Sequence, residues 1–317
     1  MTGSALLFSP CWIPLAYSWL QDASPKNSEN RLLRGGFHIN PELNNLSAGL
    51  FTSIPSLRFV AAEIVVDTRV LAMIATLIEC LEEPRPVAPG HPPAPTIRVL
   101  ATLRQFLREG TPWRSLRANV HKVSGSTLRR WLTAWARTGL LRKVHALLVA
   151  MLRGNPDLIL DSCSVRAKRG GDLTGPNPTD RAKRGTKYHV ATTGDGIPVA
   201  CLATAANVND TVLFERLFLA AFAVMPRIAA VFADKGYDAE ANRILCRRFH
   251  AAPHIHKRRR PHGSGLGKRR WPVERSNAWV LENKRLALRY DRLGFIVQSL
   301  LDTACIFLVA GRLAREF

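Results

Sequence analysis

Three acidic residues of this chain stand at positions where a metal site could be built. The apolar run 228–233 leads into Asp234, the run 158–160 leads in the same way into Asp161, and Glu274 stands at a predicted helix start. Short apolar runs indicate buried strands, and sites in α/β sheets tend to lie at the carboxyl ends of strands. Mg²⁺ prefers carboxylate oxygens, and two such ions together promote phosphoryl transfer. We therefore expect these three side chains to converge on a divalent cation site.

Each of these residues also has a purely structural interpretation. Asp234 could cap the element that follows it. Glu274 shares a helical face with Ala278 and Leu281, which predicts a carboxylate that faces the core. Such a carboxylate needs a positive partner, and Arg285 on the same face could provide it instead of a cation. The pattern of these residues leaves both interpretations open.

The chain is strongly basic, with a formal net charge of +21 over 317 residues. Such a charge indicates a polyanionic partner, of which nucleic acid is the commonest, whereas a merely solvated basic surface is the alternative. Basic residues crowd after Asp161 and in a run just before a Gly-rich loop that precedes Glu274, and they could hold DNA phosphates. They are Arg166, Lys168, Arg169 and Lys187 in the first group and Lys257, Arg258, Arg259 and Arg260 in the second.

Composition divides the chain into four regions. Residues 1–83 form an N-terminal extension without a sustained period, apart from a helix predicted over 60–83. Residues 84–95 contain six prolines, which predicts a stiff extended linker. Residues 96–152 predict a helical DNA-binding unit, and residues 153–317 predict an α/β domain, a mixed sheet with flanking helices.

The helical unit has the features of a helix-turn-helix domain. Four helical segments are predicted. Thr96 can cap the first, Ser124 is expected to cap the third, which runs over 127–138, and the fourth runs over 140–152. Arg129 and Arg130 lie off the apolar side of that third helix, where they could contact DNA bases. A plain helical bundle with a solvated basic face fits the same pattern equally well.

The second domain alternates strands and helices. Strands over 187–193 and 197–205 are expected to form a hairpin. A helix over 211–224, capped by Asn209 and Asp210, precedes the strand that leads into Asp234. The apolar run 303–310 is too short to span a bilayer and indicates a core helix. The six cysteines are scattered without a C-x-x-C pair, which fits a reducing compartment. We expect a soluble cytoplasmic protein without membrane contact.

Five ordered motifs resemble those of bacterial insertion-sequence transposases of the DDE class, with the IS-five type as the nearest group. They read D-S-C-S-V-R-A-K-R-G-G, T-G-P-N-P-T-D-R-A-K-R-G-T-K-Y-H-V, A-N-V-N-D, A-D-K-G-Y-D and R-W-P-V-E-R-S-N-A-W. The resemblance implies an RNase H-like catalytic domain, with Asp161, Asp234 and Glu274 as the metal-binding triad. The implied cofactors are two Mg²⁺ or Mn²⁺ ions.

The resemblance also bears on basic residues near Glu274. Arg270 stands at the position of an arginine that the family has four residues before the glutamate. Gly267 replaces a family tyrosine, and Leu281 replaces a family lysine. Lys284 or Arg285 is expected to serve in place of that lysine as a DNA contact.

The residues and the resemblance together predict a transposase. It would bind the double-stranded ends of its insertion sequence, cut a strand there and join the freed 3′-OH to target DNA, with a homodimer as a compatible assembly. A DDE-type nuclease that hydrolyses without joining and a decayed copy that only binds DNA are the alternatives. Within the binding surface, Arg129 and Arg130 should read base sequence, whereas the loop cluster over 257–260 should contact phosphates.

Overall fold

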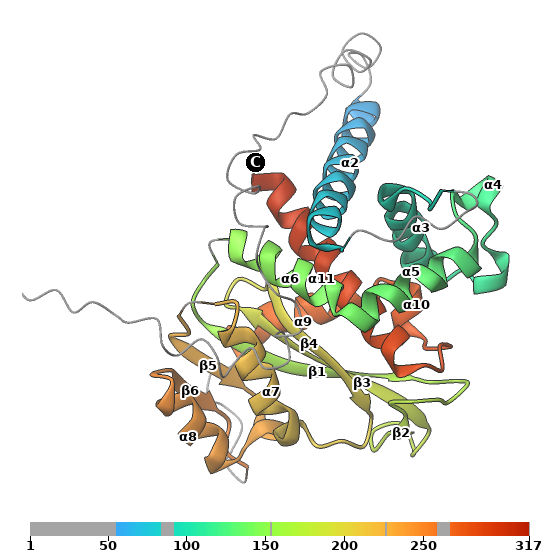
Figure 1. Ribbon diagram of the computed structural model, residues 1–317. Helices are drawn as coiled ribbons and strands as arrows, with labels where there is room; N and C mark the ends of the chain where they lie inside the picture. Colours follow the sequence, from blue (N-terminus) through green and yellow to red (C-terminus); the bar gives the residue numbers. More distant parts are fainter. Residues whose placement is uncertain (1–54, 84–91, 153, 226, 259–266, 317) are drawn as a thin grey trace, which may run out of the picture. The chain divides into compact units, whose positions relative to one another are not determined.

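The computed structural model describes residues 55–83, 92–152, 154–225, 227–258 and 267–316 (Figure 1). The predictions made for residues 1–54, for linker residues 84–91 and for Arg259 and Arg260 lie outside these ranges. The first helix, α2 (Pro55–Leu81), confirms the helix expected over 60–83.

The helical unit contains four α-helices and a short 3₁₀ turn in the order that the sequence predicts. These elements are α3 (Thr96–Glu109), η2 (Trp113–Ser115), α4 (Ala118–His121), α5 (Gly125–Thr138) and α6 (Leu140–Met151). The Ser124 hydroxyl accepts the Thr127 N–H, so the expected cap of α5 is confirmed. Thr96 does not cap α3, because Pro95 takes the cap position and Thr96 is buried in the first turn.

A mixed sheet forms the centre of the second domain. Its strands are β1 (Leu158–Arg166), β2 (Gly175–Pro176), β3 (Arg184–Thr193), β4 (Pro198–Ala205), β5 (Ala230–Ala233) and β6 (Ala252–Ile255). β3 pairs antiparallel with both β1 and β4, so the predicted hairpin is confirmed. β5 and β6 extend the sheet on the other side of β1 in parallel orientation. This order, β4-β3-β1-β5-β6, is that of an RNase H-like sheet.

Helices flank this sheet on both faces. They are α7 (Asp210–Phe222), α8 (Glu240–Arg248), α9 (Gly267–Leu281), α10 (Lys284–Ala287) and α11 (Gly294–Glu316). α9 packs on β1, β3 and β5, whereas α7 packs on β3 and β4 from the other side (Figure 1). In the described part of the chain, α11 is the one helix long and apolar enough to cross a membrane, yet 72% of that stretch is buried inside the protein. It packs on β4 and α6, as expected of a core helix.

Two carboxylates lie at different points of their elements than the sequence predicts. Asp161 is not at a strand end, because β1 continues to Arg166 while it pairs with the long arm of β3. Glu274 is not at a helix start, because α9 already begins at Gly267 and includes Pro272. Asp234 follows β5 directly, as predicted.

Candidate active site

Two neighbouring parallel strands bring Asp161 and Asp234 to the same edge. Leu160 of β1 is in register with Ala233 of β5, so the next residue along each strand is a carboxylate. The pairing follows from sequence, since both runs are apolar and both strands are buried at these positions. The two carboxylates are close enough for the charge of Asp234 to raise the pKa of Asp161.

Asp161 is a desolvated carboxylate held by two side chains of α9. Arg270 Nη2 donates to Oδ1 at 2.9 Å, and Asn277 Nδ2 donates to Oδ2 at 3.1 Å. Burial raises the pKa of Asp161 to about 6, Arg270 opposes this shift, and the charges of Asp234 and Glu274 add to it. Arg270 was expected to bind DNA, but its side chain is only 17% exposed and its contact orients Asp161 instead.

Glu274 lies on the solvent side of α9. Glu274 and Ala278 are exposed, whereas Val273, Asn277 and Val280 form the buried side. The expectation that Glu274 faces the core and pairs with Arg285 is therefore wrong. The buried face of α9 instead carries Asn277, one turn from Glu274, into contact with Asp161.

The residues at this edge fit a divalent cation by their donor chemistry. Three carboxylates come from three elements, and Asn277 Oδ1 is a buried oxygen with no hydrogen-bond partner among the described residues. Such oxygens are the ligands that hard cations accept. Within the described ranges, however, no three His, Cys, Asp or Glu side chains lie close enough to share one ion. Arg270 contacts one carboxylate oxygen of Asp161, and each such oxygen has a second lone pair free for another partner.

Gly236 allows two carboxylates to approach its backbone closely. Asp234 Oδ1 accepts the Gly236 N–H at 2.8 Å, which makes Asp234 the cap of the 3₁₀ turn η3 (Lys235–Tyr237). The structural interpretation of Asp234 is thus confirmed beside its place at the edge. A Cβ on Gly236 would lie 2.8 Å from Asp234 Oδ1 and 2.9 Å from Asp210 Oδ2. Asp210 therefore belongs to the same neighbourhood.

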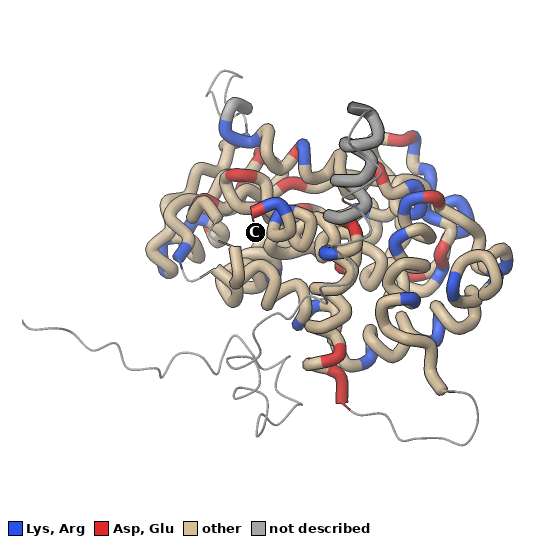
Figure 2. Tube along the Cα trace, turned by 90° about the horizontal axis from the view of Figure 1, so that it is seen from above, with Lys and Arg blue, Asp and Glu red and all other residues tan. Residues whose placement is uncertain are grey.

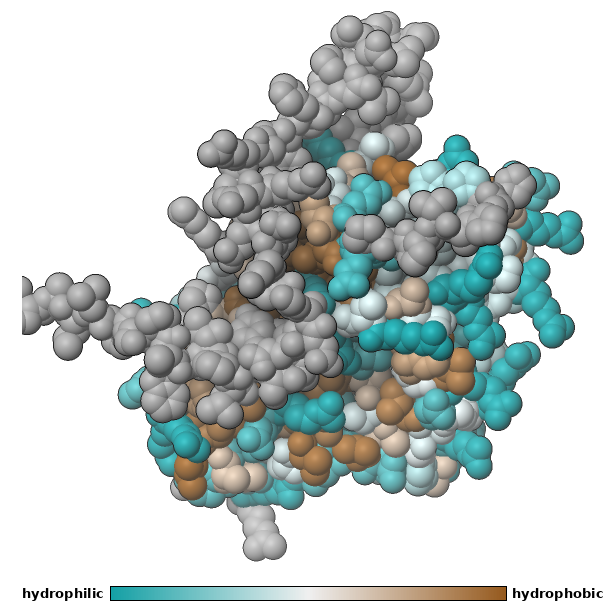
Figure 3. Space-filling view, in the orientation of Figure 1, coloured by the Kyte–Doolittle hydropathy of each residue, from teal (hydrophilic) through white to brown (hydrophobic). Residues whose placement is uncertain are grey.

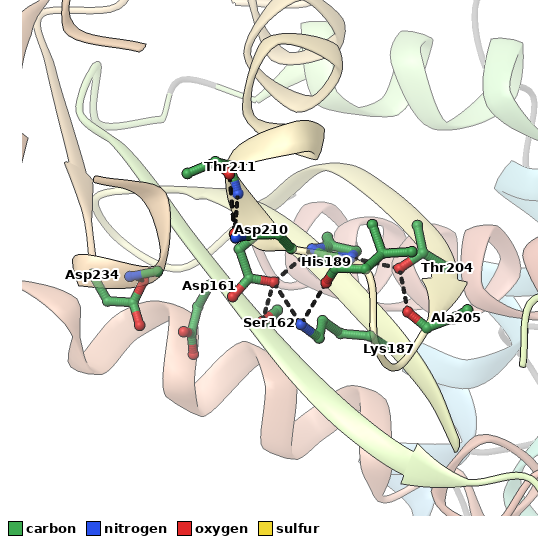
Figure 4. A network of polar contacts seen from close by, with 12 residues as sticks. Asp161, Ser162, Lys187, His189, Thr204, Ala205, Asp210, Thr211 and Asp234 are labelled. Atoms are coloured by element: carbon green, nitrogen blue, oxygen red, sulfur yellow. Dashed lines mark hydrogen bonds and ion pairs between the residues drawn. The ribbon is translucent and has the colours of Figure 1, made fainter. Parts of the chain in front are cut away.

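Asp210, which the sequence suggested only as part of a helix cap, organises a polar network (Figure 4). Its Oδ1 accepts from Ser162 Oγ at 3.2 Å and from Lys187 Nζ at 3.0 Å, and His189 Nδ1 lies 3.6 Å away. Ser162 and Asp161 are consecutive in β1, so they point to opposite faces of the sheet. The motif A-N-V-N-D was the available signal for Asp210.

Lys187 and His189 are both taken up by this network. Lys187 Nζ also donates to the Val208 carbonyl, and its side chain is 15% exposed. The prediction that Lys187 holds DNA phosphate is therefore corrected, because its ammonium group neutralises Asp210. Burial lowers the pKa of His189 to about 4, while Asp210 opposes the shift, so the imidazole is neutral near pH 7.

Several other predicted DNA contacts lie at the surface. Arg129, Arg130, Lys168, Arg169, Lys257 and Arg258 are exposed. Arg166 is exposed and paired with Asp180, and Lys284 is exposed and 3.5 Å from Glu109. Arg258 Nε donates to the Lys235 carbonyl, so the basic loop begins beside the turn that follows Asp234. Many Lys and Arg residues gather on the side that carries α3 to α5, on the right in Figure 2.

The prediction that Arg285 contacts DNA is wrong. Its side chain is 5% exposed and makes two 2.8 Å contacts with Asp291. The guanidinium also lies over the rings of Phe106 and Trp113, at 4.4 and 5.6 Å from their centres. Trp113 Nε1 donates to Asp291 as well. Arg285 therefore joins the helical unit to the segment after α9 and is not available to DNA.

Comparison with known proteins agrees with this arrangement. Residues 153–307 match the family model of the transposase DDE domain. A Burkholderia cepacia protein that is named as a transposase for insertion sequence element IS402 is 40% identical over 174 residues, which are 51% of this chain and 82% of that protein. A second protein of the same element, of 16.2 kDa and uncharacterised, is 30% identical over 122 residues, 37% of this chain and 83% of its own length.

Solved structures add little to these matches. The crystal structure of a pre-cleavage Mos1 transpososome covers 74% of this chain and 82% of its own, with 11% identity and a TM-score of 0.24. A likeness at that score supports no argument about this protein.

Four findings define the class of protein. They are the family match, the identity to the first relative, the RNase H-like sheet and its acidic edge. The chain belongs to the bacterial insertion-sequence transposases of the DDE class. Proteins of this class are enzymes that cut and transfer DNA strands, with DNA as the partner and divalent cations as cofactors. The narrower assignment to the IS-five type stays a prediction.

Proposed function

We propose that this transposase binds the ends of its own insertion sequence, cuts a strand there and joins the freed 3′-OH to target DNA at the edge formed by Asp161, Asp234 and Glu274. The observation that carries the proposal is the register of β1 and β5, which puts two carboxylates at adjacent strand positions under the helix that bears the third. The attacking oxygen belongs to water in the cutting step and to the 3′-OH in the joining step.

The acidic residues would hold one or two divalent cations, Mg²⁺ or Mn²⁺, which when bound activate the attacking oxygen and stabilise the leaving oxygen. Asp161 suits this role because it is desolvated and lies within electrostatic reach of Asp234 and Glu274. Arg270 and Asn277 hold its carboxylate in one orientation. Glu274, exposed on α9, is free to approach the phosphate region from the solvent side.

Exposed basic residues of the catalytic domain would hold the DNA backbone. Lys257 and Arg258 follow β6 and lie beside the turn after Asp234, whereas Lys168 and Arg169 follow β1. Their exposed charges suit phosphate contacts that carry no sequence information. We further propose that two copies act together on DNA in the cytoplasm, and the burial of α11 supports its role as a core helix that does not enter a membrane.

The test is Asp234→Asn, measured with duplexes that carry the DNA flanking the gene. Loss of one negative charge should abolish Mg²⁺-dependent cutting, because the amide binds the cation weakly, while DNA binding and thermal unfolding stay as in the wild type. Glu215→Gln is the matched control, since Glu215 is an exposed carboxylate of α7 away from the edge and should keep full cutting.

The DNA products distinguish the proposed function from the alternative functions. Joined strands alongside cut strands identify a transposase, whereas cut strands alone would identify a nuclease. Near wild-type cutting by the Asp234→Asn variant would show that Asp234 is not a ligand.

A further inference from the structure

A basic cleft lies between the helical unit and the catalytic domain. Its volume is about 860 Å³, and its walls include Trp113 and Arg129 from the helical unit and Arg169, Tyr290 and Arg292 from the catalytic domain. Residues from 40 positions (Arg129 and Arg169) to 179 positions (Trp113 and Arg292) apart in sequence thus face one space. In the space-filling view, hydrophilic side chains gather along the right-hand margin, where α3 to α5 lie (Figure 3).

The cleft carries uncompensated positive charge. Arg114, Arg129, Arg169 and Arg292 line it and are exposed, and none has a carboxylate partner among the residues that the structure describes. Asp291 is the single carboxylate in the lining, and Arg285 already neutralises it through two 2.8 Å contacts. Four guanidinium groups around one concave surface focus a positive potential there, which attracts an anion with several charges.

The position of the cleft relative to the acidic edge follows from β1. Arg169 comes shortly after the end of that strand, and Ala167 still makes a bridge to Arg289. At about 3.3 Å per residue, the six steps from Asp161 to Ala167 span about 20 Å. Phosphates of one DNA strand follow each other at about 3.4 Å along the helix axis, so this span equals about six base pairs.

We propose that this cleft binds the sugar–phosphate backbone of the DNA end about six base pairs from the phosphate that is cut. The proposal rests on the proposed function, since it takes the acidic edge as the place of cutting. Each domain supplies two of the four arginines, so a single duplex would hold the helical unit against the catalytic domain. Arg129 then contacts phosphate and does not read a base, which leaves base reading on α5 to Arg130.

Binding curves at several salt concentrations test the charge count. Arg169→Ala/Arg292→Ala should weaken binding to element-end and random duplexes by the same factor. The slope of log K against log salt should become shallower by about 1.8, because each lost phosphate contact contributes about 0.9. Arg114→Ala/Arg129→Ala removes the opposite wall and should give the same change. Arg137→Ala is the control, an exposed arginine of α5 outside the cleft, and should leave the slope unchanged.

Single methylphosphonate substitutions along the element end test the position. In the wild type, substitution about six base pairs from the cut should weaken binding, and Arg169→Ala/Arg292→Ala should lose this sensitivity while it keeps sensitivity elsewhere. The proposal is overturned if both double variants keep the wild-type salt slope, or if Arg137→Ala lowers the slope as much as they do. It is also overturned if the double variants remain sensitive to the methylphosphonate about six base pairs from the cut. Competition with an acidic peptide tests the occupant of the cleft. Failure of the peptide to displace the DNA supports DNA as the occupant, whereas tighter binding of the peptide than of DNA contradicts the proposal.

These outcomes are distinct from failure of the proposed function. If the wild type cuts and joins DNA while the cleft variants keep their salt slope, the cleft assignment alone fails. If the wild type neither cuts nor joins, the acidic edge is misassigned whatever the slopes show.

Discussion

Breaking the buried pair of Arg285 and Asp291 from one side should strongly destabilise the protein, because the remaining charge would be buried without a partner. The Asp291→Asn change keeps the side-chain shape and an acceptor for Trp113 Nε1, but it leaves the charge of Arg285 buried without a counter-charge. At an effective dielectric constant of about 20, opposite charges about 4 Å apart attract by about 4 kcal/mol. Removal of one partner from a buried pair costs about 3–5 kcal/mol, which agrees with this figure.

Urea unfolding measures this loss. With a slope of about 3 kcal/mol per molar, Asp291→Asn should lower the midpoint by about 1–2 M. The double variant Arg285→Met/Asp291→Asn removes both charges and should recover a large part of that loss, because no buried charge is left unpaired. The aromatic contacts of Arg285 with Phe106 and Trp113 are lost in the double variant, so recovery should be incomplete.

The exposed pair Arg312–Glu316 is a matched control. Its N–O distance is also 2.8 Å, but its side chains are 53% and 43% exposed. Glu316→Gln should therefore change the unfolding free energy by less than about 1 kcal/mol. If Asp291→Asn is no more damaging than Glu316→Gln, or if the double variant is less stable than Asp291→Asn, burial of an unpaired charge is not what destabilises the Asp291→Asn variant.

Two further changes test the acidic edge and a buried imidazole. Gly236→Ala should reduce Mg²⁺-dependent cutting at least tenfold with little effect on DNA binding. The reason is that the added Cβ would lie less than 3 Å from oxygens of Asp234 and Asp210. Full cutting activity of this variant would show that the close approach is not needed. His145 lies buried against the Pro198 carbonyl, and burial lowers its pKa to about 4 from 6.5. Above pH 6.5 the imidazole is neutral in both the folded and the unfolded state, so its protonation does not oppose folding. As the pH falls from 6.5 towards 4, the unfolded state binds the proton first, and the free energy of unfolding falls by about 3 kcal/mol. His145→Gln should therefore show a flatter pH profile of unfolding free energy than the wild type between these values; parallel profiles would contradict the assignment.

Local signals in the sequence were enough to predict most elements. Ser124 and Asn209 accept backbone N–H groups at the helix starts where capping residues were expected. The two apolar runs form neighbouring parallel strands, so the pairing of Asp161 with Asp234 at one edge agrees with the sequence prediction. The caps and each apolar run depend on residues close together in the chain, although the two strands that pair are 73 residues apart (Leu158 with Val231).

The errors concern residues whose partners are distant in sequence. β1 extends past Asp161 because β3, about 25 residues later, supplies hydrogen bonds along its whole length. Lys187 turns inward because Asp210 lies beside it, and Arg285 turns inward because Phe106 and Trp113 cover it. A basic residue carries no local mark that distinguishes a phosphate contact from a buried ion pair, so these assignments needed the fold.

The way α9 holds Asp161 has a consequence for the protein during its synthesis. Arg270 and Asn277 come 109 and 116 residues after Asp161. At about 5–20 residues per second, a growing chain carries the sheet strand for roughly 5–20 s before the helix that orients its carboxylate exists. Under the proposed roles, Glu274 is also missing throughout that interval. A ribosome-bound chain therefore passes through synthesis of its helical unit and its first strands without the complete acidic edge that the proposed cutting needs.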